Sequence, residues 1–239
     1  MSQVKKVLVT TSSFAKQSAD ALNMLKENGF VVEMNPYGRK LTEAELRDLL
    51  DKNKPIGLLA GTEKISSGIV ENAKGYLKVI SRIGVGWDNI DHEAAQKFGI
   101  KVFRTSGVLN KAVGELTLGM MLTGLRQLSL HDRNIRNGIW KKNMGALLSG
   151  KIVGILGFGS IGQYVGKLAH AFGARVIYYD PEPKQAGCVQ SVSLEVLLKK
   201  SEILSIHSSA GKQLLNEIRL KKFAKRDAII INTARGEII

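Results

Sequence analysis

The chain has 239 residues, 44% of them apolar and 23% charged, with a formal charge of +14. This length is sufficient for two domains, because single cores stop growing near about 250 residues. The composition excludes a membrane span, since no apolar stretch approaches the roughly 18 residues that a membrane helix needs. The start lacks a secretory signal, and the single cysteine, Cys188, excludes an internal disulfide and a thiolate metal site, so we expect a cytoplasmic protein without a metal.

The positive charge is concentrated in the second half of the chain. Residues 1–103 hold 15 Lys and Arg against 12 Asp and Glu, whereas residues 104–239 hold 20 against 9. Acidic residues are interspersed among the basic ones, and aromatic residues that could stack on bases make up only 6% of the chain. We interpret the charge as a solvated helix surface and expect no nucleic-acid partner, with a basic nucleic-acid-binding half as the weaker alternative.

The first half alternates short apolar runs with amphipathic stretches, which predicts an α/β domain with a parallel sheet over residues 1–103. One helix is expected to close at Gly29, and another to begin with a capping box of Thr42 and Glu45. Strands are expected at residues 6–10, 30–34, 56–60, 77–81 and 100–104.

A long helical stretch over residues 110–138 then interrupts the alternation. Its apolar positions leave little polar surface, so we expect it to be buried between domains or between subunits and to form a homodimer contact. These positions are Val113, Leu116, Leu118, Met120, Met121, Leu122 and Leu125.

The alternation resumes after residue 150 and predicts a second α/β domain, with residues 104–239 as its span. The predicted fold class is therefore α/β with two Rossmann-like or flavodoxin-like parallel-sheet domains. Strands are expected at residues 151–156, 175–180, 203–207 and 228–232, and helices at 160–173, 193–201 and 213–224.

A GxGxxG motif follows the strand at 151–156 and stands at the start of a helix. In this setting Gly157 makes the tight turn, Gly159 lets a pyrophosphate approach the backbone, and Gly162 lets helix and strand pack closely. The next strand ends at Asp180, where a carboxylate can bind the adenosine ribose and repels a 2′-phosphate. The sequence therefore predicts an NAD site and favours NAD over NADP.

Three stretches of the chain resemble the D-isomer-specific 2-hydroxyacid dehydrogenases, and more closely the phosphoglycerate dehydrogenase branch of that family. They are VISRIGVGWDNID, the segment LSGKIVGILGFGSIGQYVGKLAHAFGARVIYYDP and the closing IIINTARGEII. A fourth, TSGVLNKAVGELTLGMML, matches the segment that opens a helix in the family. The resemblance covers the whole chain and implies hydride transfer between NAD and C2 of a D-2-hydroxy acid.

The resemblance also implies roles for individual residues. Residues 1–103 become the substrate domain and 104–239 the NAD domain. Arg235 holds and polarises the substrate, the backbone N–H groups of Val85 and Gly86 receive its carboxylate, and Arg82 is a further anion contact. The positions that match the family's cofactor contacts are Val85, Ser160, Ile161, Asp180, Ser208, Thr233, Ala234 and Arg235.

Four histidines are present, and none takes the family's acid–base position. His207 ends a strand beside the predicted cofactor site, and we interpret it as a packing or cofactor contact. His92, His131 and His170 fall on predicted helices and are interpreted as surface or satisfied polar residues.

The chain departs from the family pattern in several places. The family's glutamate and catalytic histidine lie downstream of the NTARG motif, so a C-terminally truncated chain is expected, with an NAD-binding module without catalysis as the alternative function. The loop after His207 is shorter than usual, which weakens the assignment of Ser208, and residues 225–227 replace a Lys-Pro-Gly turn. Ala60 and Gly61 stand where the phosphoglycerate branch often has an arginine, so 3-phosphoglycerate is only one candidate substrate.

Overall fold

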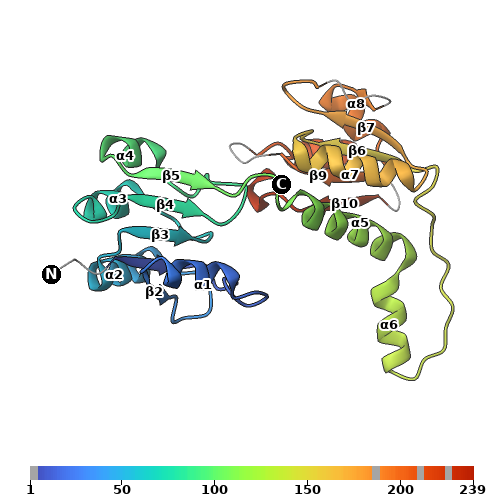
Figure 1. Cartoon of the computed structure of the whole chain (residues 1–239). Coiled ribbons are helices and arrows are strands. Elements are labelled where there is room, and N and C mark those ends of the chain that lie inside the picture. The colour runs from blue at the N-terminus through green and yellow to red at the C-terminus, as the bar shows by residue number, and fades with distance from the viewer. Residues whose placement is uncertain (1–4, 185–188, 209–212, 224–227) are drawn as a thin grey trace. The chain divides into compact units, whose positions relative to one another are not determined.

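The computed structural model describes residues 5–184, 189–208, 213–223 and 228–239. Cys188 and the turn at 225–227 lie outside these ranges. The chain divides into two compact units, Met1–Gly107 and Val108–Ile239, and the sheet of each unit has five strands (Figure 1). Every strand pair is parallel, which confirms the predicted α/β class.

Unit 1 has the strand order β2-β1-β3-β4-β5. This is the doubly wound order of flavodoxin-like folds, in which ligands bind where the strand order reverses. The strands are β1 (Lys6–Val9), β2 (Val31–Met34), β3 (Gly57–Ala60), β4 (Val79–Arg82) and β5 (Lys101–Arg104). The helices are α1 (Asp20–Glu27), α2 (Glu43–Asn53), α3 (Ser67–Ala73) and α4 (His92–Lys97). In unit 1 the reversal lies between β1 and β3.

The core of unit 1 forms because apolar side chains of α2, α3 and α4 pack on its central strands. Leu46 and Leu50 of α2 and Ile69 of α3 are fully buried against Leu8, Leu58 and Ile80 of the sheet. The capping box at Thr42 is present, and Gly29 takes a positive φ of 78° just after α1. Both helix signals that were predicted for this half of the chain are confirmed.

Unit 2 has the strand order β10-β9-β6-β7-β8, which is the Rossmann order with its reversal between β6 and β9. The strands are β6 (Ile152–Leu156), β7 (Arg175–Tyr179), β8 (Gln190–Ser191), β9 (Ile203–Ile206) and β10 (Ile229–Asn232). The helices are α5 (Asn110–Arg126), α6 (Leu128–Arg136), α7 (Ser160–Ala171), α8 (Leu194–Lys200) and α9 (Glu217–Phe223), followed by the 3-10 turn η1 (Gly236–Ile238).

Two apolar clusters form the core of unit 2. One joins α5 and α7 to the sheet through Met121 and Val165, and the other joins α8 and α9 to it through Leu197 and Phe223. Helices α5 and α7 approach closely at Gly114, where a Cβ would lie 2.4 Å from the Tyr164 ring. A glycine is therefore required for this helix contact.

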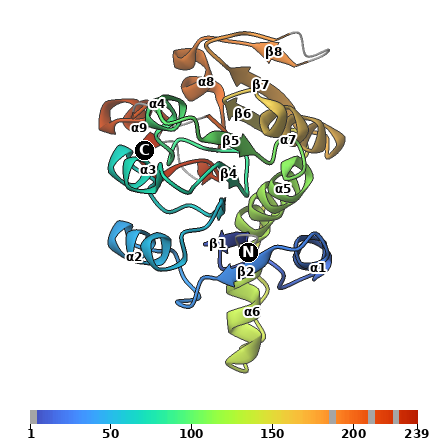
Figure 2. The same ribbon diagram turned by 60° about the vertical axis from the view of Figure 1, so that its left-hand side comes forward.

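The single long helix predicted at 110–138 is wrong, because the helix breaks at Gln127. Gln127 adopts a left-handed φ of 53°, which ends α5, and α6 begins at the next residue. Its side chain donates a hydrogen bond to the Met144 carbonyl at 3.1 Å, which holds the break. Figures 1 and 2 both show α6 extending beyond the end of α5, away from the sheet of unit 2.

The apolar surface of this stretch is only half buried within the single chain. In α5, Met121 and Leu125 are buried, whereas Leu116 and Met120 are 55% and 43% exposed. Helix α6 has no buried residue. We call residues 127–147 the projecting arm, because its apolar side chains remain at the surface of unit 2. The exposed ones are Leu128, Leu130, Ile135, Ile139, Trp140, Met144 and Leu147.

Two further details of unit 2 differ from the prediction. Helix α9 begins only at Glu217, four residues after the predicted start, and the short edge strand β8 was not predicted. No helix in the described ranges combines the length and apolar character that a membrane crossing requires.

Candidate functional site

The glycine-rich turn joins β6 to α7 at the point where the sheet of unit 2 reverses. Gly157 has a φ of 91°, and a Cβ there would lie 2.5 Å from the backbone nitrogen of Ser208. A Cβ on Gly162 would lie 2.2 Å from the Gly157 carbonyl oxygen. Gly159 differs, because nothing lies within 4 Å of the place where its Cβ would stand. Two glycines therefore permit close packing, and the third leaves open space beside the helix start.

The N-terminus of α7 presents backbone donors to this open space. Gly159 is the N-cap residue and no side chain caps the helix. The first-turn N–H groups, which include those of Ser160 and Ile161, are the positive end of a 12-residue helix. The Ser160 hydroxyl bonds Asn110 Oδ1 at 3.2 Å, which ties this turn to the start of α5. The arrangement fits the diphosphate of a dinucleotide.

Asp180 follows directly after β7, next to the glycine-rich turn. Its Oδ2 accepts a hydrogen bond from the Phe158 N–H at 2.7 Å, and its Oδ1 accepts one from the Glu182 N–H at 3.0 Å. These bonds fix the carboxyl group at the carboxyl end of the sheet. A carboxyl group at this place can accept hydrogen bonds from a ribose.

A chain of hydrogen bonds runs beneath the ends of β9 and β10. His207 Nε2 lies 2.7 Å from the Ser205 hydroxyl, and its Nδ1 lies 3.2 Å from the Thr233 hydroxyl. The Thr233 hydroxyl in turn lies 3.3 Å from that of Thr117, which donates to the Val113 carbonyl at 2.7 Å. Burial lowers the pKa of His207 to about 4. The imidazole is therefore neutral at neutral pH.

The partners of His207 determine where its proton lies. The Thr117 hydroxyl donates its one proton to the Val113 carbonyl, so in its bond with Thr233 it must be the acceptor. The Thr233 hydroxyl therefore donates to Thr117 and accepts from the Nδ1–H of His207. Ser205 donates to Nε2. The network acts as a support under Thr233, which agrees with the interpretation of His207 as a packing residue.

The segment after β10 forms a tight turn that presents Arg235. The Asn232 side chain accepts from the Ala234 N–H at 3.0 Å and donates to the Arg235 carbonyl at 2.8 Å. The Arg235 guanidinium donates to the Ala234 carbonyl at 3.1 Å, and the residue is half-buried. Asn232 therefore fixes the backbone that carries the predicted catalytic arginine.

In unit 1, the predicted substrate residues lie in the loop after β4, which we call the GVG loop (residues 83–90). Gly84 has a φ of 145°, and its Cβ would lie 2.4 Å from Arg82 Nη1, so the buried arginine packs under the loop. Among the described residues, no group accepts a hydrogen bond from the N–H of Val85 or Gly86. Both residues are half-buried. These two N–H groups are available to an anion.

The predicted residues thus gather in two places. Arg82, Val85 and Gly86 lie at the carboxyl edge of the sheet in unit 1. The remaining predicted residues lie at the carboxyl edge of unit 2: Gly157, Gly159, Ser160, Ile161, Gly162, Asp180, Ser208, Thr233, Ala234 and Arg235. The sequence analysis did not predict Thr117, Glu63 or Arg104. A signal existed for Arg104, because it ends a predicted strand and the neighbouring strand ends in Arg82.

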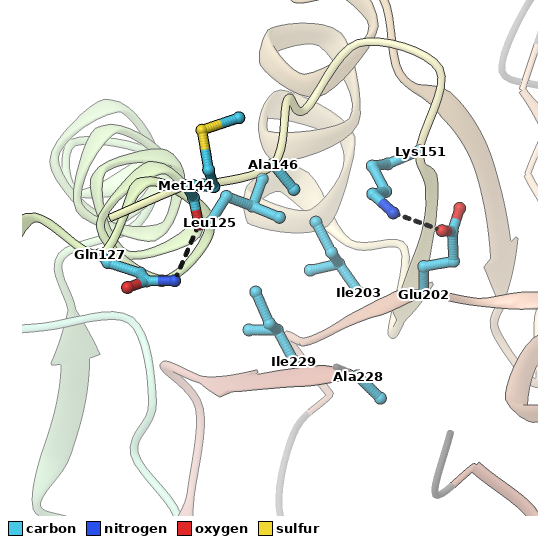
Figure 3. A pocket seen from close by; sticks show the side chains of 11 residues that line it. Leu125, Gln127, Met144, Ala146, Lys151, Glu202, Ile203, Ala228 and Ile229 are labelled. Carbon is cyan, nitrogen blue, oxygen red and sulfur yellow. Dashed lines mark hydrogen bonds and ion pairs between the residues drawn. The ribbon is translucent and has the colours of Figure 1, made fainter. Parts of the chain in front are cut away.

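A cavity of about 600 Å³ lies at the opposite edge of unit 2 (Figure 3). Its walls include Lys151, Glu202 and Ala228, which directly precede β6, β9 and β10. Lys151 and Glu202 form an ion pair at 2.6 Å on one side of it. Since ligands of open parallel sheets bind at the carboxyl ends of strands, this cavity is not the predicted site. Among the described residues, no cluster of His, Cys, Asp and Glu is arranged to hold a metal ion.

Comparison with known proteins identifies the second half of the chain. Residues 118–239 match the family model of the D-isomer specific 2-hydroxyacid dehydrogenase, NAD binding domain. A glyoxylate reductase of Thermococcus litoralis is 38% identical over 208 residues, which are 80% of this chain and 62% of that protein. A D-3-phosphoglycerate dehydrogenase of Methanocaldococcus jannaschii is 36% identical over 229 residues, 92% of this chain and 43% of that protein. The chain thus spans less than two thirds of both relatives.

A solved structure agrees with this similarity. The crystal structure of the TT0316 protein from Thermus thermophilus superposes with a TM-score of 0.87 at 38% identity. The superposition covers 98% of this chain and 75% of that protein. The fold of the chain is therefore shared with a longer protein.

Proposed function

The chain belongs to the D-isomer specific 2-hydroxyacid dehydrogenase family, and from this membership we propose that it takes part in hydride transfer between NAD and C2 of a D-2-hydroxy or 2-oxo acid. NAD is the cofactor of the matching family domain. The observation that carries the proposal is the turn at Gly157, Gly159 and Gly162, whose open side faces an uncapped helix start beside Asp180.

NAD, when bound, supplies the nicotinamide carbon that gives or takes the hydride. The chain's own groups hold and orient the cofactor. We assign the diphosphate to the N–H groups of Ser160 and Ile161 and the adenosine ribose to Asp180. Thr233 and Ala234, supported by His207 and Asn232, contact the cofactor on the β10 side. Ser208 and Val85 complete the proposed contacts.

The substrate is held by charge and by backbone donors. The N–H groups of Val85 and Gly86 receive the carboxylate, and Arg82 adds positive charge below the GVG loop. Arg235 bonds the carboxylate and the 2-oxo oxygen, where it stabilises the negative charge that develops during hydride transfer. The named relatives act on glyoxylate and D-3-phosphoglycerate, so a 2-oxo or 2-hydroxy acid is the substrate class. The relatives lend no support to a module without catalysis.

The proposal is tested by following NADH oxidation with glyoxylate or hydroxypyruvate. Arg235→Ala should lower kcat/KM by about 10² to 10³, because the charge is needed in the transition state. The Kd for NADH should rise much less, since Arg235 is only one of several proposed cofactor contacts. Arg175→Ala is the control, since this exposed arginine begins β7 at the opposite edge of the sheet. Equal losses in both variants, or a parent chain that does not bind NADH, would overturn the proposal.

We also propose that the protein acts as a cytoplasmic homodimer, with contact through residues 110–138 and the rest of the projecting arm. The support is the set of apolar side chains on α6, such as Leu128 and Ile135, which are 51% and 56% exposed. The single cysteine fits a reducing compartment. Leu128→Ser with Ile135→Ser should give a monomer in sedimentation analysis, and a parent chain that is already monomeric would contradict the dimer.

A further inference from the structure

A second arginine stands beside the proposed carboxylate site of unit 1. Strand β5 ends at Arg104, which is in register with Arg82 of β4. Parallel strands bring both side chains to the same edge, where the GVG loop begins.

Arg104 is held against the GVG loop by two contacts. Its guanidinium lies 4.3 Å from the centre of the Trp87 ring, a cation–π contact. Its Nη1 also donates to the Val85 carbonyl at 3.3 Å. Trp87 is itself fixed by His92, whose ring lies 4.5 Å from it and whose Nε2 lies 3.1 Å from the Trp87 carbonyl. The guanidinium is therefore placed on the loop that presents the N–H groups of Val85 and Gly86.

The two arginines differ in what they can offer to a ligand. Arg82 is buried and fills the space under Gly84. Arg104 is exposed, and among the described residues no carboxylate lies within ion-pair distance of it. The loop carries one carboxylate, that of the exposed Asp88. The Arg104 guanidinium is thus a positive charge that Trp87 and Val85 hold in place on the solvent-exposed side of the GVG loop.

We propose that Arg104 is a specificity-determining residue that binds a second anionic group of the substrate. The inference rests on the proposed function, in which Val85 and Gly86 receive the first carboxylate. A guanidinium next to that site favours 2-hydroxy and 2-oxo acids with a phosphate or a second carboxylate over those with one charge. Gly61, at the edge of the neighbouring strand β3, supplies no such charge.

Paired ligands that differ only in the second anion test this proposal. Binding of 3-phosphoglycerate and D-glycerate is measured through Trp87 fluorescence and by calorimetry, in a Trp140→Phe background because Trp140 is 92% exposed. In this background 3-phosphoglycerate should bind about tenfold or more tightly than D-glycerate, as expected for one charge-assisted contact. D-malate in place of 3-phosphoglycerate shows whether a carboxylate serves as well as a phosphate.

Variants then show whether the preference depends on Arg104 itself or on the overall positive charge of the surface. Arg104→Ala should remove the preference for the doubly charged ligand and leave D-glycerate binding unchanged, and Arg104→Lys should retain part of it. Lys101→Ala, at the exposed start of the same strand, should retain it fully. A preference that survives in Arg104→Ala overturns the inference, as does inorganic phosphate that binds as tightly as 3-phosphoglycerate.

Failure of this inference and failure of the proposed function give different results. If NADH binds and D-glycerate binds, but without dependence on Arg104, only the specificity role is wrong. If NADH does not bind to the chain, the proposed function itself fails.

Discussion

The two sheets of the molecule share one architecture and differ at the point where the strand order reverses. In unit 2 this point, between β6 and β9, is open: Gly157 packs against Ser208 and Gly159 leaves space at the start of α7. In unit 1 the corresponding point, between β1 and β3, is filled by the buried side chain of Glu63. Its carboxyl oxygen accepts from the Thr10 hydroxyl and from the Gly61 N–H at 3.0 Å.

This difference is the reason why we propose different ligand sites for the two sheets. A carboxyl group that uses the local donors leaves none for a phosphate, so Glu63 closes the usual site of unit 1. The N–H groups of Val85 and Gly86, for which no acceptor is found among the described residues, lie instead in the GVG loop after β4, the strand next to β3. Unit 2 retains the usual position for a dinucleotide. A five-stranded parallel sheet with one reversal can thus serve a cofactor or a small anion, according to which side chain stands at the reversal.

The largest expected effect is a loss of stability when the glycine-rich turn of unit 2 is given a side chain. Gly162→Ala places a Cβ 2.2 Å from the Gly157 carbonyl, so stability should fall by about 3 kcal/mol or more. Gly159→Ala is the matched control, because nothing lies near its Cβ. It should unfold like the parent chain yet bind NADH more weakly. Thermal unfolding and NADH fluorescence separate the two effects, and a stable Gly162→Ala chain would refute the packing role.

His207 predicts a pH dependence for unit 2. Its pKa is about 4 in the folded chain because of burial, against about 6.5 when unfolded. Between these two pH values the unfolded chain binds more protons than the folded chain, so acid favours unfolding. The free energy of unfolding should therefore be highest above about pH 6.5 and should fall by about 3 kcal/mol as the pH is lowered to about 4. Urea unfolding at several pH values measures this slope, and His207→Asn should reduce it. An unchanged slope in that variant would exclude His207 as the source.

Removing the side chain that closes unit 1 should have a smaller effect. Glu63→Ala removes one buried acceptor from the Thr10 hydroxyl and from the Gly61 N–H, at a cost of about 1 to 3 kcal/mol. The cost is limited because the two donors retain the Leu59 carbonyl and Thr10 Oγ1 as acceptors, each at 3.1 Å. NADH binding should change little, because every proposed cofactor contact except Val85 belongs to unit 2. Glu71→Ala, at a 62% exposed side chain, is the control and should change stability by less than about 0.5 kcal/mol. Weaker NADH binding in Glu63→Ala would contradict the separation of the two sites.

The smallest expected effect concerns the choice of cofactor. Asp180→Ala removes the carboxyl group proposed for the ribose, so NADH should bind about tenfold more weakly, or about 1.4 kcal/mol. NADPH should lose less, because the repulsion of its 2′-phosphate is also removed. Fluorescence titration of both cofactors measures the ratio. A ratio equal to that of the parent chain would remove Asp180 from the cofactor site.

Most of the fold could be predicted from the sequence because parallel strands and glycine turns leave local signals. The apolar runs at β6 and β9, the capping box at Thr42 and the glycines of the β6–α7 turn all depend on neighbouring residues. The break at Gln127 could not be predicted, because a left-handed residue that is neither glycine nor asparagine has no composition signal and is held by Met144, 17 residues away. Edge strand β8 could not be predicted either, because two residues are too few to show the alternation of apolar and polar side chains that marks a strand.

The candidate site was predicted where one motif carries several residues and was missed where distant strands meet. Gly157 and Asp180 could be assigned from spacing alone, and their roles remain to be tested. Three residues could not be assigned because their partners are distant in the sequence. Thr117 bonds Thr233, 116 residues away, Glu63 bonds Thr10, 53 residues away, and Arg104 bonds Val85, 19 residues away. Such pairs depend on strand order, which becomes visible only in the folded chain.

The most direct test of the account is the transfer of a labelled hydride. The chain is incubated with hydroxypyruvate and with NADH that carries deuterium at both hydrogen positions of C4 of the nicotinamide, and the product is examined by NMR and on a chiral column. The account predicts deuterium at C2 of a product that is the D enantiomer, and much less of it with Arg235→Ala. Product without deuterium at C2, an L product, or equal transfer by Arg235→Ala would contradict it.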